Sequence, residues 1–503
     1  MQYISTRGEN TGYSSAQAIR AGIASDGGLF VPEQIPFISK EVIQSMAGLS
    51  YKEIAAMVLH PLLDDFTYQE ICEFIESAYS EDKFGEEIAP LVQLNKYNDR
   101  EHILELWHGP TAAFKDMALQ LLPHLMTASV KKSGDLKKVC ILTATSGDTG
   151  KAALEGFKDV DGTFVVVYYP QKGVSEMQRL QMITQDGGNC SVIAVDGCFD
   201  DAQNGVKAIF SDKQLSIELE SENIHLSSAN SINWGRLAPQ IVYYFSSYAK
   251  LLHDEKITLG EKINFVVPTG NFGNILSAWY AMKMGLPVNK LICASNRNKV
   301  LSDFFRNGIY DRNRPFYKTN SPSMDILISS NLERLLFEIT GRNPDKVKDW
   351  MNSLNSKGRY TVDSITLKKV QETFVGGFAD EAGTIKTIRD VYDRCDHCVD
   401  THTAVGFNVY ERYLARSKDE SKTVFVSTAS PFKFPGDVSD AIFGRGYQKG
   451  RSEEVLLKEL SEETGLEIPQ SLSGIYSRPV LHTREADKNS MKNILLEVLQ
   501  KEN

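Results

Sequence analysis

The stretch His108-Gly109-Pro110-Thr111-Ala112-Ala113-Phe114-Lys115-Asp116 places a single lysine just after a tight turn. Its first four residues are typical of a turn, and a mostly apolar segment follows, from Ala112 to Leu122. The apolar neighbours indicate that Lys115 is buried, and burial lowers the pKa of an ammonium group because it disfavours the charged form. A lysine whose amine is neutral near neutral pH is suited to Schiff-base chemistry. The alternative is a surface lysine at the start of an amphipathic helix.

Downstream of this turn, short apolar runs alternate with segments of helical length. The runs predict strands at Val139–Leu142, Thr163–Tyr169, Ser191–Val195, Asn264–Val267, Leu291–Ala294 and Thr423–Val426. Helices are predicted between them, at 149–157, 175–184, 200–210, 237–252 and 274–284. Strands that are apolar on both faces are typical of parallel sheets covered by helices. The sequence therefore predicts an α/β fold with two open, mainly parallel sheets.

The same pattern divides the chain into four regions. Residues 1–100 are predicted to form a mostly helical N-terminal domain, with helices at 14–24, 51–63 and 68–79. Residues 101–235 and 236–450 each carry one strand series, and a helical segment near 236–253 joins the two. Residues 451–503 are charged and are predicted to form a helical C-terminal extension.

The composition of the 503-residue chain argues against several classes of protein. Its formal net charge is −10, so we expect no nucleic-acid partner, and a bound anion must be held by a local site. Seven scattered cysteines suit a reducing compartment better than a disulfide framework. The polar N-terminus does not look like a signal peptide, and no segment has the ~18 consecutive apolar residues of a membrane span. We therefore expect a cytoplasmic protein with no membrane partner.

Three loops follow predicted strands, at the sheet edge where parallel sheets bind ligands. The first, Thr143-Ala144-Thr145-Ser146-Gly147-Asp148-Thr149-Gly150-Lys151, ends where a helix begins, and its small residues leave backbone N–H groups free to bind an anion. The spacing argues against a nucleotide P-loop, because position 145 is threonine rather than glycine and position 152 is alanine rather than a hydroxyl residue. A small carboxylate or phosphate is the predicted ligand, with a plain strand-to-helix turn as the alternative.

The other two loops follow strands farther along the chain. In Pro268-Thr269-Gly270-Asn271-Phe272-Gly273-Asn274, two glycines bracket an open turn before a helix, which predicts a second anion site. This loop lacks the spacing of a dinucleotide-binding fingerprint. The third loop, Ser427-Thr428-Ala429-Ser430-Pro431, offers hydroxyls that could hydrogen-bond a ring nitrogen, with a capped turn as the alternative.

Two further stretches carry candidate binding residues. Ser227-Ser228-Ala229-Asn230-Ser231-Ile232-Asn233-Trp234-Gly235-Arg236 gathers amides, hydroxyls and one arginine at a helix start, which suits phosphate recognition. A helix cap beside a surface arginine is the alternative. The close spacing of Cys395, His397, Cys398 and His402 could suggest zinc. No second Cys-x-x-Cys pair accompanies them, so we predict no metal, and we interpret His402 as a polar group of a loop.

A buried lysine, two anion loops and a hydroxyl loop together predict pyridoxal phosphate (PLP), which has one aldehyde, one phosphate and one ring nitrogen. The same residues carry a resemblance to a known family. The chain resembles the threonine synthases, which are fold-type II PLP enzymes, in HGPTAAFKD (108–116), TATSGDTGKAA (143–153), SANSINWGR (228–236), PTGNFGN (268–274), DTHTAVG (400–406), STASPFKFP (427–435) and the opening YSSAQAIRAGIASDGGLFVP (13–32). The resemblance covers nearly the whole chain, although little of it lies beyond residue 450.

The resemblance implies roles for individual residues. Lys115 would hold PLP as a Schiff base and move protons, Asp116 would lie near the phenolic oxygen of PLP, and Thr428 would face the pyridine nitrogen, with Ser427 as the second choice. The PLP phosphate would be cradled by Gly270, Asn271, Phe272, Gly273 and Asn274. The substrate carboxylate would be received by Ser146, Gly147, Asp148 and Thr149, and the substrate phosphate by Ser228, Asn230, Asn233 and Arg236. No role is implied for Ser430, where many relatives have histidine.

The resemblance also implies a reaction, the conversion of O-phospho-L-homoserine and water to L-threonine and phosphate, which is the last step of threonine biosynthesis. Residues 101–235 would form the smaller, mobile domain, residues 236–450 the larger PLP-binding domain, and the protein would be a monomer. Two alternatives stay open at the level of the sequence. One is a phospho-lyase of the same fold that releases ammonia and 2-oxobutanoate, and the other is a non-catalytic ligand-binding relative.

Overall fold

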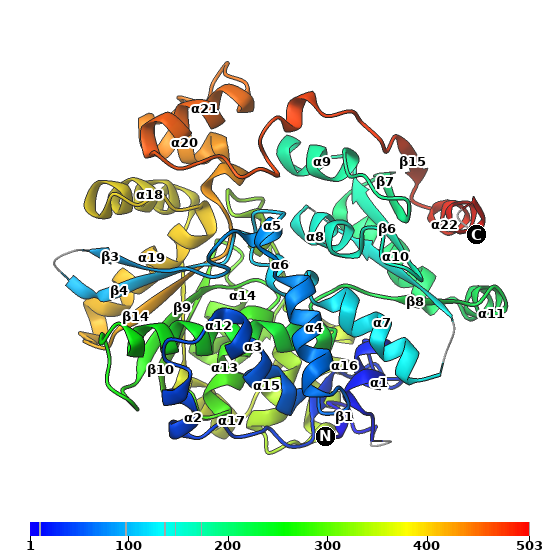
Figure 1. The fold of residues 1–503 in the computed structure, drawn as a ribbon, viewed down its shortest axis with the longest axis horizontal. Helices are drawn as coiled ribbons and strands as arrows, with labels where there is room; N and C mark the ends of the chain where they lie inside the picture. The colour runs from blue at the N-terminus through cyan, green and yellow to red at the C-terminus, as the bar shows by residue number, and fades with distance from the viewer. Residues whose placement is uncertain (10–11, 96–97, 135–136, 146, 173, 502–503) are drawn as a thin grey trace.

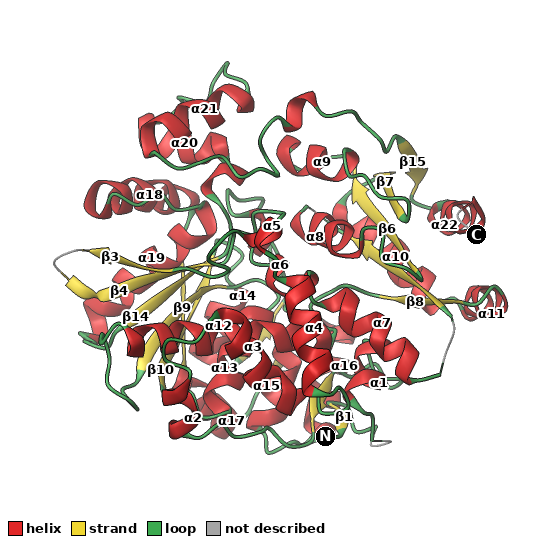
Figure 2. Cartoon of the chain, viewed as in Figure 1, coloured by secondary structure: helices red, strands yellow, loops and turns green. Residues whose placement is uncertain are grey.

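Two mainly parallel sheets carry all the strands predicted from the sequence, and they lie in different halves of the molecule (Figures 1 and 2). The computed structural model describes residues 1–503 apart from 10–11, 96–97, 135–136, 146, 173 and 502–503. Helices cover the sheets, and the N-terminal residues are mostly helical, so the predicted fold class is confirmed. Among the described residues, no helix combines the length and the apolar character that crossing a membrane requires.

The smaller sheet has five parallel strands in the order β15-β7-β6-β5-β8. They are β5 (Lys138–Ala144), β6 (Thr163–Pro170), β7 (Cys190–Asp196), β8 (Ile224–Ser227) and β15 (Arg484–Asp487). Successive side chains of β5 face opposite sides, because Val139 and Ile141 pack in the main core whereas Cys140 and Leu142 pack in a second core under α10 and α22. Burial of both faces explains why these strands read as continuous apolar runs.

The larger sheet has six strands in the order β13-β10-β9-β14-β4-β3. They are β3 (Leu91–Asn95), β4 (Asn98–Glu105), β9 (Ile263–Pro268), β10 (Val288–Ser295), β13 (Phe374–Phe378) and β14 (Thr423–Ser427). All neighbours are parallel except β3 and β4. Because β4 and β14 run in the same direction, the turn after β4 and the loop after β14 leave the sheet at the same edge.

Helices flank both sheets, and one long helix connects the two regions. Those near the smaller sheet are α6 (Asp116–Leu119), α7 (Leu122–Lys132), α8 (Asp148–Phe157), α9 (Glu176–Ile183), α10 (Phe199–Ser211) and α11 (Lys213–Ser221). Those near the larger sheet are α13 (Gly273–Lys283), α14 (Val300–Asn307), α18 (Glu381–Cys395), α19 (Thr401–Ser417), the 3-10 turn η3 (Pro431–Lys433) and α20 (Pro435–Phe443). The connecting helix α12 (Trp234–His253) is buried along nearly its whole length, which explains its lack of a polar face.

The N-terminal residues form helices that cover this connection. The elements are β1 (Tyr3–Ser5), α1 (Ser15–Ala21), β2 (Phe30–Pro32), α2 (Lys40–Ser45), α3 (Tyr51–Leu59), the 3-10 turn η1 (His60–Leu62), α4 (Tyr68–Ala78) and α5 (Glu81–Phe84). Ser14, Ser50 and Thr67 form capping boxes, which fix the starts of the predicted helices α1, α3 and α4. Helix α1 packs on α7, and α3 packs on α12.

The stretch between β10 and α19 is mostly helical and also contains short strands, which the sequence does not predict. Its remaining elements are β11 (Ile309–Asp311), the 3-10 turn η2 (Pro322–Met324), α15 (Leu332–Ile339), α16 (Pro344–Lys357), β12 (Arg359–Thr361) and α17 (Ser364–Thr373). Strands of three residues are too short to show a reliable period in the sequence.

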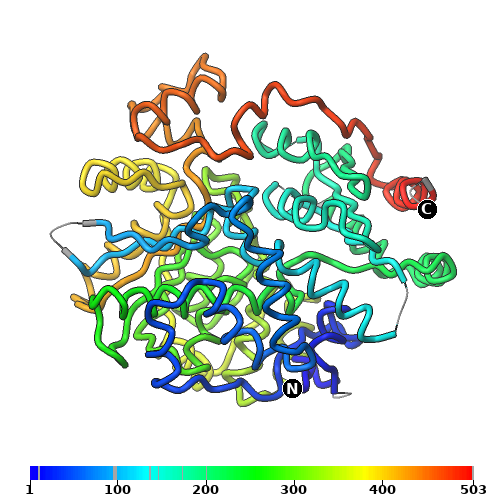
Figure 3. The backbone as a smooth tube through the Cα atoms, viewed as in Figure 1, coloured from blue at the N-terminus to red at the C-terminus, as the bar shows by residue number. Residues whose placement is uncertain are grey.

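The C-terminal segment runs from the larger sheet region to the smaller sheet (Figure 3). Helix α21 (Glu453–Thr464) packs on α20, and η4 (Ile475–Ser477) follows. Strand β15 then joins the edge of β7, and α22 (Met491–Lys501) packs on α10. The strand is not predicted because Arg484-Glu485-Ala486-Asp487 has a single apolar residue; only Ala486 is buried.

Candidate active site

Lys115 lies on the turn after β4, and this turn is bonded to the loop after β14. The Phe114 N–H donates to the Thr428 carbonyl at 2.9 Å. Ala113 and Ala429 form an antiparallel bridge beside that bond. The lysine turn and the hydroxyl loop, which the sequence analysis treats separately, therefore form one unit at the carboxyl edge of the larger sheet.

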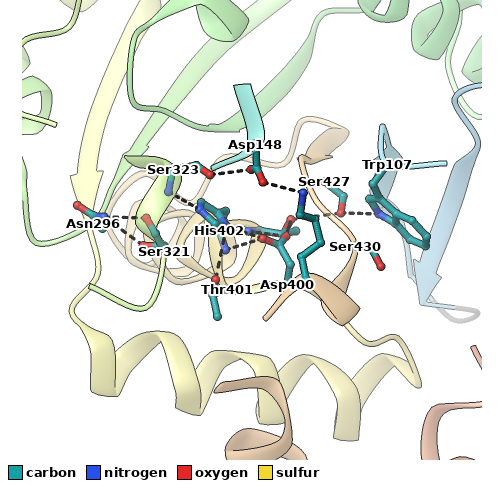
Figure 4. Close-up of polar contacts among 12 residues, drawn as sticks. Trp107, Asp148, Asn296, Ser321, Ser323, Asp400, Thr401, His402, Ser427 and Ser430 are labelled. Carbon is teal, nitrogen blue, oxygen red and sulfur yellow. Dashed lines mark hydrogen bonds and ion pairs between the residues drawn. The ribbon is translucent and has the colours of Figure 1, made fainter. Parts of the chain in front are cut away.

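Asp148, the first residue of α8, connects the elements of the site (Figure 4). Its Oδ2 lies 3.2 Å from Lys115 Nζ, and its Oδ1 lies 2.6 Å from Lys433 Nζ. Gln178 Nε2 donates to Oδ1 at 2.9 Å, and Ser323 Oγ donates to Oδ2 at 2.9 Å. Although burial opposes ionisation, the two ammonium groups hold the pKa of Asp148 well below its ordinary value. The carboxylate is thus charged and fully occupied by partners.

Lys115 is largely buried, with 12% of its side chain exposed, as its apolar neighbours predict. Burial lowers the pKa of its amine, and although Asp148 opposes that change, the positive charges of Lys433 and Arg236 add to it. An amine in this setting is a better nucleophile at neutral pH than an exposed lysine.

The glycine loop 270–274 lies between β9 and α13. Phe272 has a φ of 66°, in the left-handed region, so the chain turns sharply just before the free N–H groups of the first turn of α13. A Cβ on Gly270 would lie 3.0 Å from the Ser323 carbonyl oxygen, so a glycine is needed there. The Asn271 carbonyl accepts from the Asn331 N–H at 3.1 Å and fixes the loop. Together with Gly273, these residues form a cradle suited to an anion.

Asn274 carries an unused donor at this cradle. Its Oδ1 accepts from the hydroxyls of Tyr243 at 2.6 Å and Tyr244 at 2.5 Å, which fixes the orientation of the amide. Its Nδ2 is buried and has no hydrogen-bond partner within the described part of the chain. A buried donor without a partner is costly, and a bound anion would satisfy it.

Arg236 is a second buried group with a free donor. It is 3% exposed, and its Nη1 donates to the Ala229 carbonyl at 2.7 Å. Its Nε lacks a partner, and no carboxylate pairs with it among the described residues. Burial lowers the pKa of Arg236 to about 10, so the guanidinium is charged at neutral pH. A buried, charged guanidinium with a free donor has the chemistry that suits a phosphate or carboxylate.

The other residues predicted at this stretch make structural bonds. Asn233 caps α12 by accepting from the Gly235 N–H at 2.9 Å, and its Nδ2 donates to the Ile19 carbonyl at 2.9 Å. The Ser228 hydroxyl accepts from the Asn230 N–H at 3.2 Å, and Asn230 is half-buried. Asn233 is therefore engaged with the chain through both atoms of its amide, whereas no hydrogen bond from the side chains of Ser228 and Asn230 to another described residue is seen.

In the hydroxyl loop, Ser427 and Thr428 differ in whether the hydroxyl is already hydrogen-bonded. Ser427 Oγ accepts from Trp107 Nε1 at 3.1 Å and from Thr403 Oγ1 at 3.2 Å. Thr428 is buried, and its hydroxyl has no hydrogen bond to a described residue. Thr428 is therefore the freer of the two candidates for a ring nitrogen.

Asp116 forms hydrogen bonds with the turn that precedes Lys115. Its Oδ2 accepts from the Thr111 N–H at 2.8 Å, and its Oδ1 accepts from Thr111 Oγ1 at 2.7 Å. Burial raises the pKa of Asp116 to about 6. A Cβ on Gly109 would lie 2.6 Å from the Asp116 Cβ, so Asp116 can approach the turn this closely only because residue 109 has no side chain.

The structure describes the first anion loop, residues 143–151, except for Ser146, which lies outside the described residues. The Gly147 N–H donates to Thr145 Oγ1 at 3.0 Å, and a Cβ on Gly147 would lie 2.4 Å from the side chain of Gln178. Thr149 is half-buried in the first turn of α8. The loop passes close over α9, and its charged member, Asp148, faces the two lysines.

His402 is part of a network that the sequence analysis does not predict (Figure 4). Its Nδ1 lies 2.7 Å from Asp400 Oδ2, and its Nε2 accepts from the Ser323 N–H at 3.1 Å. Since the Ser323 hydroxyl bonds Asp148, this network holds η2 against the site. The order Asp-x-His at a helix cap is the only signal for it. Lys433 is also absent from the residues predicted for the site, although apolar residues flank it in the sequence as they flank Lys115.

The two histidines of the suspected zinc cluster contact carboxylates: His402 pairs with Asp400, and His397 pairs with Glu105. His397 Nε2 lies 3.3 Å from Glu105 Oε1, and His108 Nε2 lies 2.6 Å from Glu105 Oε2. Although burial opposes it, these contacts lower the pKa of Glu105 to about 2. No group of three or more metal-binding side chains arranged for a metal ion occurs among the residues that the structure describes.

The donors of the site fit the groups of PLP. A lysine of lowered pKa suits the aldehyde, the unused Nδ2 of Asn274 and the N–H groups of the cradle suit the phosphate, and the free hydroxyl of Thr428 suits the ring nitrogen. The free Nε of the buried Arg236 is a further donor that would suit a second anion.

Comparisons with known proteins agree with this assignment. The chain matches family models described as threonine synthase N terminus (residues 2–79), pyridoxal-phosphate dependent enzyme (83–429) and threonine synthase, C-terminal (403–493). It is 39% identical to threonine synthase of Pseudomonas aeruginosa, over 88% of this chain and 91% of that one. It is also 39% identical to threonine synthase-like 1 of Homo sapiens, over 85% of this chain but only 58% of that protein. The crystal structure of PLP-bound threonine synthase from Brucella melitensis is similar, with a TM-score of 0.87 and 34% identity, over 100% of this chain and 99% of that chain.

Proposed function

Because the chain belongs to the threonine synthase family, we propose that it converts O-phospho-L-homoserine and water to L-threonine and phosphate. Its cofactor is PLP, and its chemical class is that of a PLP-dependent lyase. The observation that carries the proposal is a single site with a buried lysine of lowered pKa and a buried arginine that has an unused donor. These are the groups needed to hold an aldehyde and a substrate phosphate.

We assign four parts of the site to the cofactor. Lys115 would hold the aldehyde carbon through its amine, and the loop 270–274 would hold the phosphate. Thr428 would hydrogen-bond the pyridine nitrogen, and a neutral hydroxyl there does not force that nitrogen to be protonated. Asp116, whose oxygens both bond Thr111, would keep the lysine turn in shape rather than contact the phenolic oxygen.

We assign the two ends of the substrate to two anion positions. Arg236 would bind the phosphate, with Ser228, Asn230 and Asn233 shaping the surrounding turn. The carboxylate would be received by backbone N–H groups and hydroxyls of residues 146–149 rather than by the side chain of Asp148, because that carboxylate is charged and already bonded to two lysines. Holding both ends fixes the reacting carbons of the substrate in place.

The chain's own residues would then move protons and stabilise charge. When bound, PLP supplies an electron sink that stabilises negative charge on the carbons next to the substrate amine. Lys115, freed by the substrate amine, would remove the Cα proton and return it, since burial lowers the pKa of its amine and so favours the neutral form that accepts a proton. Asp148 would orient that amine, and Arg236 would stabilise the departing phosphate.

Product analysis tests the proposal. Incubation with O-phospho-L-homoserine and PLP should give L-threonine and phosphate in equal amounts. Release of 2-oxobutanoate and ammonia without threonine would contradict it and would indicate a phospho-lyase. Lys115→Ala should lose turnover and the visible absorbance of lysine-bound PLP while its circular dichroism stays unchanged. A wild-type protein that shows no such absorbance would point to a non-catalytic relative.

We also propose a division into domains that follows the sheets. The smaller domain would comprise most of 101–235, with 484–501 added, and the larger domain would comprise 236–450, with β3 and β4 added. The support is that β4 pairs with β14 and β15 pairs with β7. The expectations of a cytoplasmic location, a monomer and no nucleic-acid partner stay predictions from the sequence, and a solution measurement of molecular mass would test the second.

A further inference from the structure

Lys433 lies against the carboxylate that holds Lys115, yet the proposed mechanism does not use it. It ends the short turn η3, and its side chain is 0% exposed. Its Nζ lies 2.6 Å from Asp148 Oδ1 and donates to the Thr111 carbonyl at 3.1 Å. A fully buried ammonium group is costly, so its presence beside the lysine of the site needs a physical explanation.

The charges around the two lysines do not balance. Asp148 is the ion-pair partner of both Lys115 and Lys433, and neither lysine has another carboxylate within ion-pair distance among the described residues. Arg236 adds a third positive charge that acts on Lys115, and Asp116 is the other acidic group that acts on Lys433. Gln178 and Ser323, the remaining partners of Asp148, are neutral. Three positive charges, on Lys115, Lys433 and Arg236, therefore face two carboxylates in a buried place, and the oxygens of Asp116 bond Thr111 rather than a lysine, so the excess of positive charge favours loss of one proton.

The hydrogen bonds indicate which lysine loses that proton. Lys433 has two acceptors, Asp148 at 2.6 Å and the Thr111 carbonyl at 3.1 Å. Within the described part of the chain, Lys115 has one acceptor, Asp148, at the longer distance of 3.2 Å. Hydrogen bonds to the charged form of a lysine stabilise it, and Lys115 has the fewer and the longer ones, so Lys115 is the lysine that gives up a proton.

We propose that Lys433 is a positioning residue that occupies the charge of Asp148, so that Lys115 keeps a neutral, nucleophilic amine. The inference rests on the proposed role of Lys115 and deepens it. Only the neutral amine can attack the aldehyde carbon; a carbon–nitrogen bond then forms, the aldehyde oxygen leaves as water, and the proton of the former ammonium goes to solvent. Without Lys433, Asp148 would pair with Lys115 alone and stabilise its ammonium form.

The test follows the attachment of PLP as a function of pH. Full-length protein stripped of PLP is mixed with PLP, and the rise of lysine-bound absorbance gives a rate at each pH. Lys433→Met should raise the pH midpoint of this rate by at least about one pH unit, and at a fixed pH below both midpoints it should slow attachment about tenfold. Lys433→Arg, which keeps the charge, should restore the midpoint at least in part.

Lys151→Met is the matched control, because Lys151 is also buried, at 7% exposure, and pairs with Glu155 at 2.9 Å in the same helix as Asp148. It should leave the midpoint unchanged. A folded Lys433→Met protein with the wild-type midpoint would overturn the proposal and leave Lys433 as an anchor of the turn.

A second variant decides the question if Lys433→Met does not fold. Asp148→Asn removes the charge that favours the ammonium of Lys115, so it should lower the midpoint; an unchanged or higher midpoint would overturn the proposal. If the wild-type protein gains no lysine-bound absorbance, or Lys115→Ala still gains it, then the role of Lys115 itself fails. By contrast, a wild-type protein that binds PLP normally, together with a Lys433→Met variant of unchanged midpoint, would contradict only the role of Lys433.

Discussion

Arg236 is the residue whose removal should separate substrate binding from cofactor binding. Its unused Nε and its burial suit the substrate phosphate. For Arg236→Ala we expect the KM for O-phospho-L-homoserine to rise about 30- to 150-fold, because a charge-assisted hydrogen bond to a buried phosphate contributes roughly 2–3 kcal/mol. The absorbance of lysine-bound PLP should stay as in the wild type. Steady-state kinetics check this, with Arg236→Lys as an intermediate case; an unchanged KM would remove Arg236 from the site.

His102 should make the stability of the protein sensitive to mild acid. It is 3% exposed on β4, its ring nitrogens have no partner within the described residues, and burial lowers its pKa from 6.5 to about 4. Because the folded state disfavours the protonated ring, its contribution is complete above about pH 6.5 and is lost as the pH falls towards 4. The loss amounts to about 3 kcal/mol of unfolding free energy.

Denaturant unfolding of His102→Leu and wild type at several pH values tests this expectation. The difference in unfolding free energy between the two should change in favour of the variant between pH 6.5 and 4. The same substitution at the exposed His253 is the control. Parallel pH curves for wild type and His102→Leu would refute the expectation.

At the scale of single residues, sequence could predict those whose signal is local. Lys115 and the cradle at 270–274 stand out because a lysine among apolar residues and two glycines after a strand are visible in a short window. Lys433 has apolar neighbours like those of Lys115, but its role, like that of His402, depends on contacts with Asp148 and Ser323, which are distant in the chain and are brought to them by the fold. The occupied carboxylate of Asp148 could not be predicted either, because it depends on partners from four separate parts of the chain.

Among the elements, β15 offers the clearest test of packing. Ala486 is its one buried residue and packs in the second core beside the smaller sheet. Ala486→Asp should place a carboxylate in that apolar core and destabilise the attachment of the tail by roughly 2–4 kcal/mol. Limited proteolysis should then cut the C-terminal segment faster than in the wild type. Glu485→Asp, at an exposed neighbouring position, should leave the cleavage rate unchanged.

Equal cleavage rates for Ala486→Asp and Glu485→Asp would show that β15 contributes little to holding the tail. The comparison is sharp because both variants end in the same residue type, one on each face of the strand. Register with β7 is fixed by this alternation, since Ala486 lies opposite Val195.

The elements that can be predicted from the sequence are those with a strong hydrophobic periodicity or a long apolar run. The strands β5, β6, β7, β9, β10 and β14 were predicted because burial of both faces gives unbroken runs of apolar residues. Strand β4, Asn98–Glu105, was missed because its sequence is mostly polar, and β15 because it is an edge strand with one buried residue. For both strands, the structure depends on pairing with a neighbouring strand that is distant in the sequence, and the local sequence does not show which strand that is.

For the whole molecule, PLP should act as a clamp between distant parts of the chain. The lysine turn follows β4, and the cradle follows β9, so a ligand bound to both stabilises the folded chain. At one hundred times its Kd, PLP should add about 2.7 kcal/mol to the free energy of unfolding. Thermal unfolding with and without PLP measures this as a higher midpoint. Lys115→Ala should lose much of the increase, and an equal increase in that variant would argue against attachment at Lys115.

The overall architecture was predictable because the alternation of strands and helices allows few arrangements. What could not be predicted is how the chain order maps onto the two sheets. Strand β4 precedes the smaller sheet in sequence but lies in the larger one, and β15 follows the larger sheet but lies in the smaller one. Such returns are set by contacts between distant residues rather than by composition.

The return of β15 has a consequence for how the protein is made. During translation, β7 leaves the ribosome long before the residues that cover its outer edge, so the growing chain carries an unpaired strand edge through most of its synthesis. Such an edge is a template for pairing with other chains. No nascent chain that stops before Asp487 can complete the smaller sheet, and molecular chaperones would have most to protect in that interval.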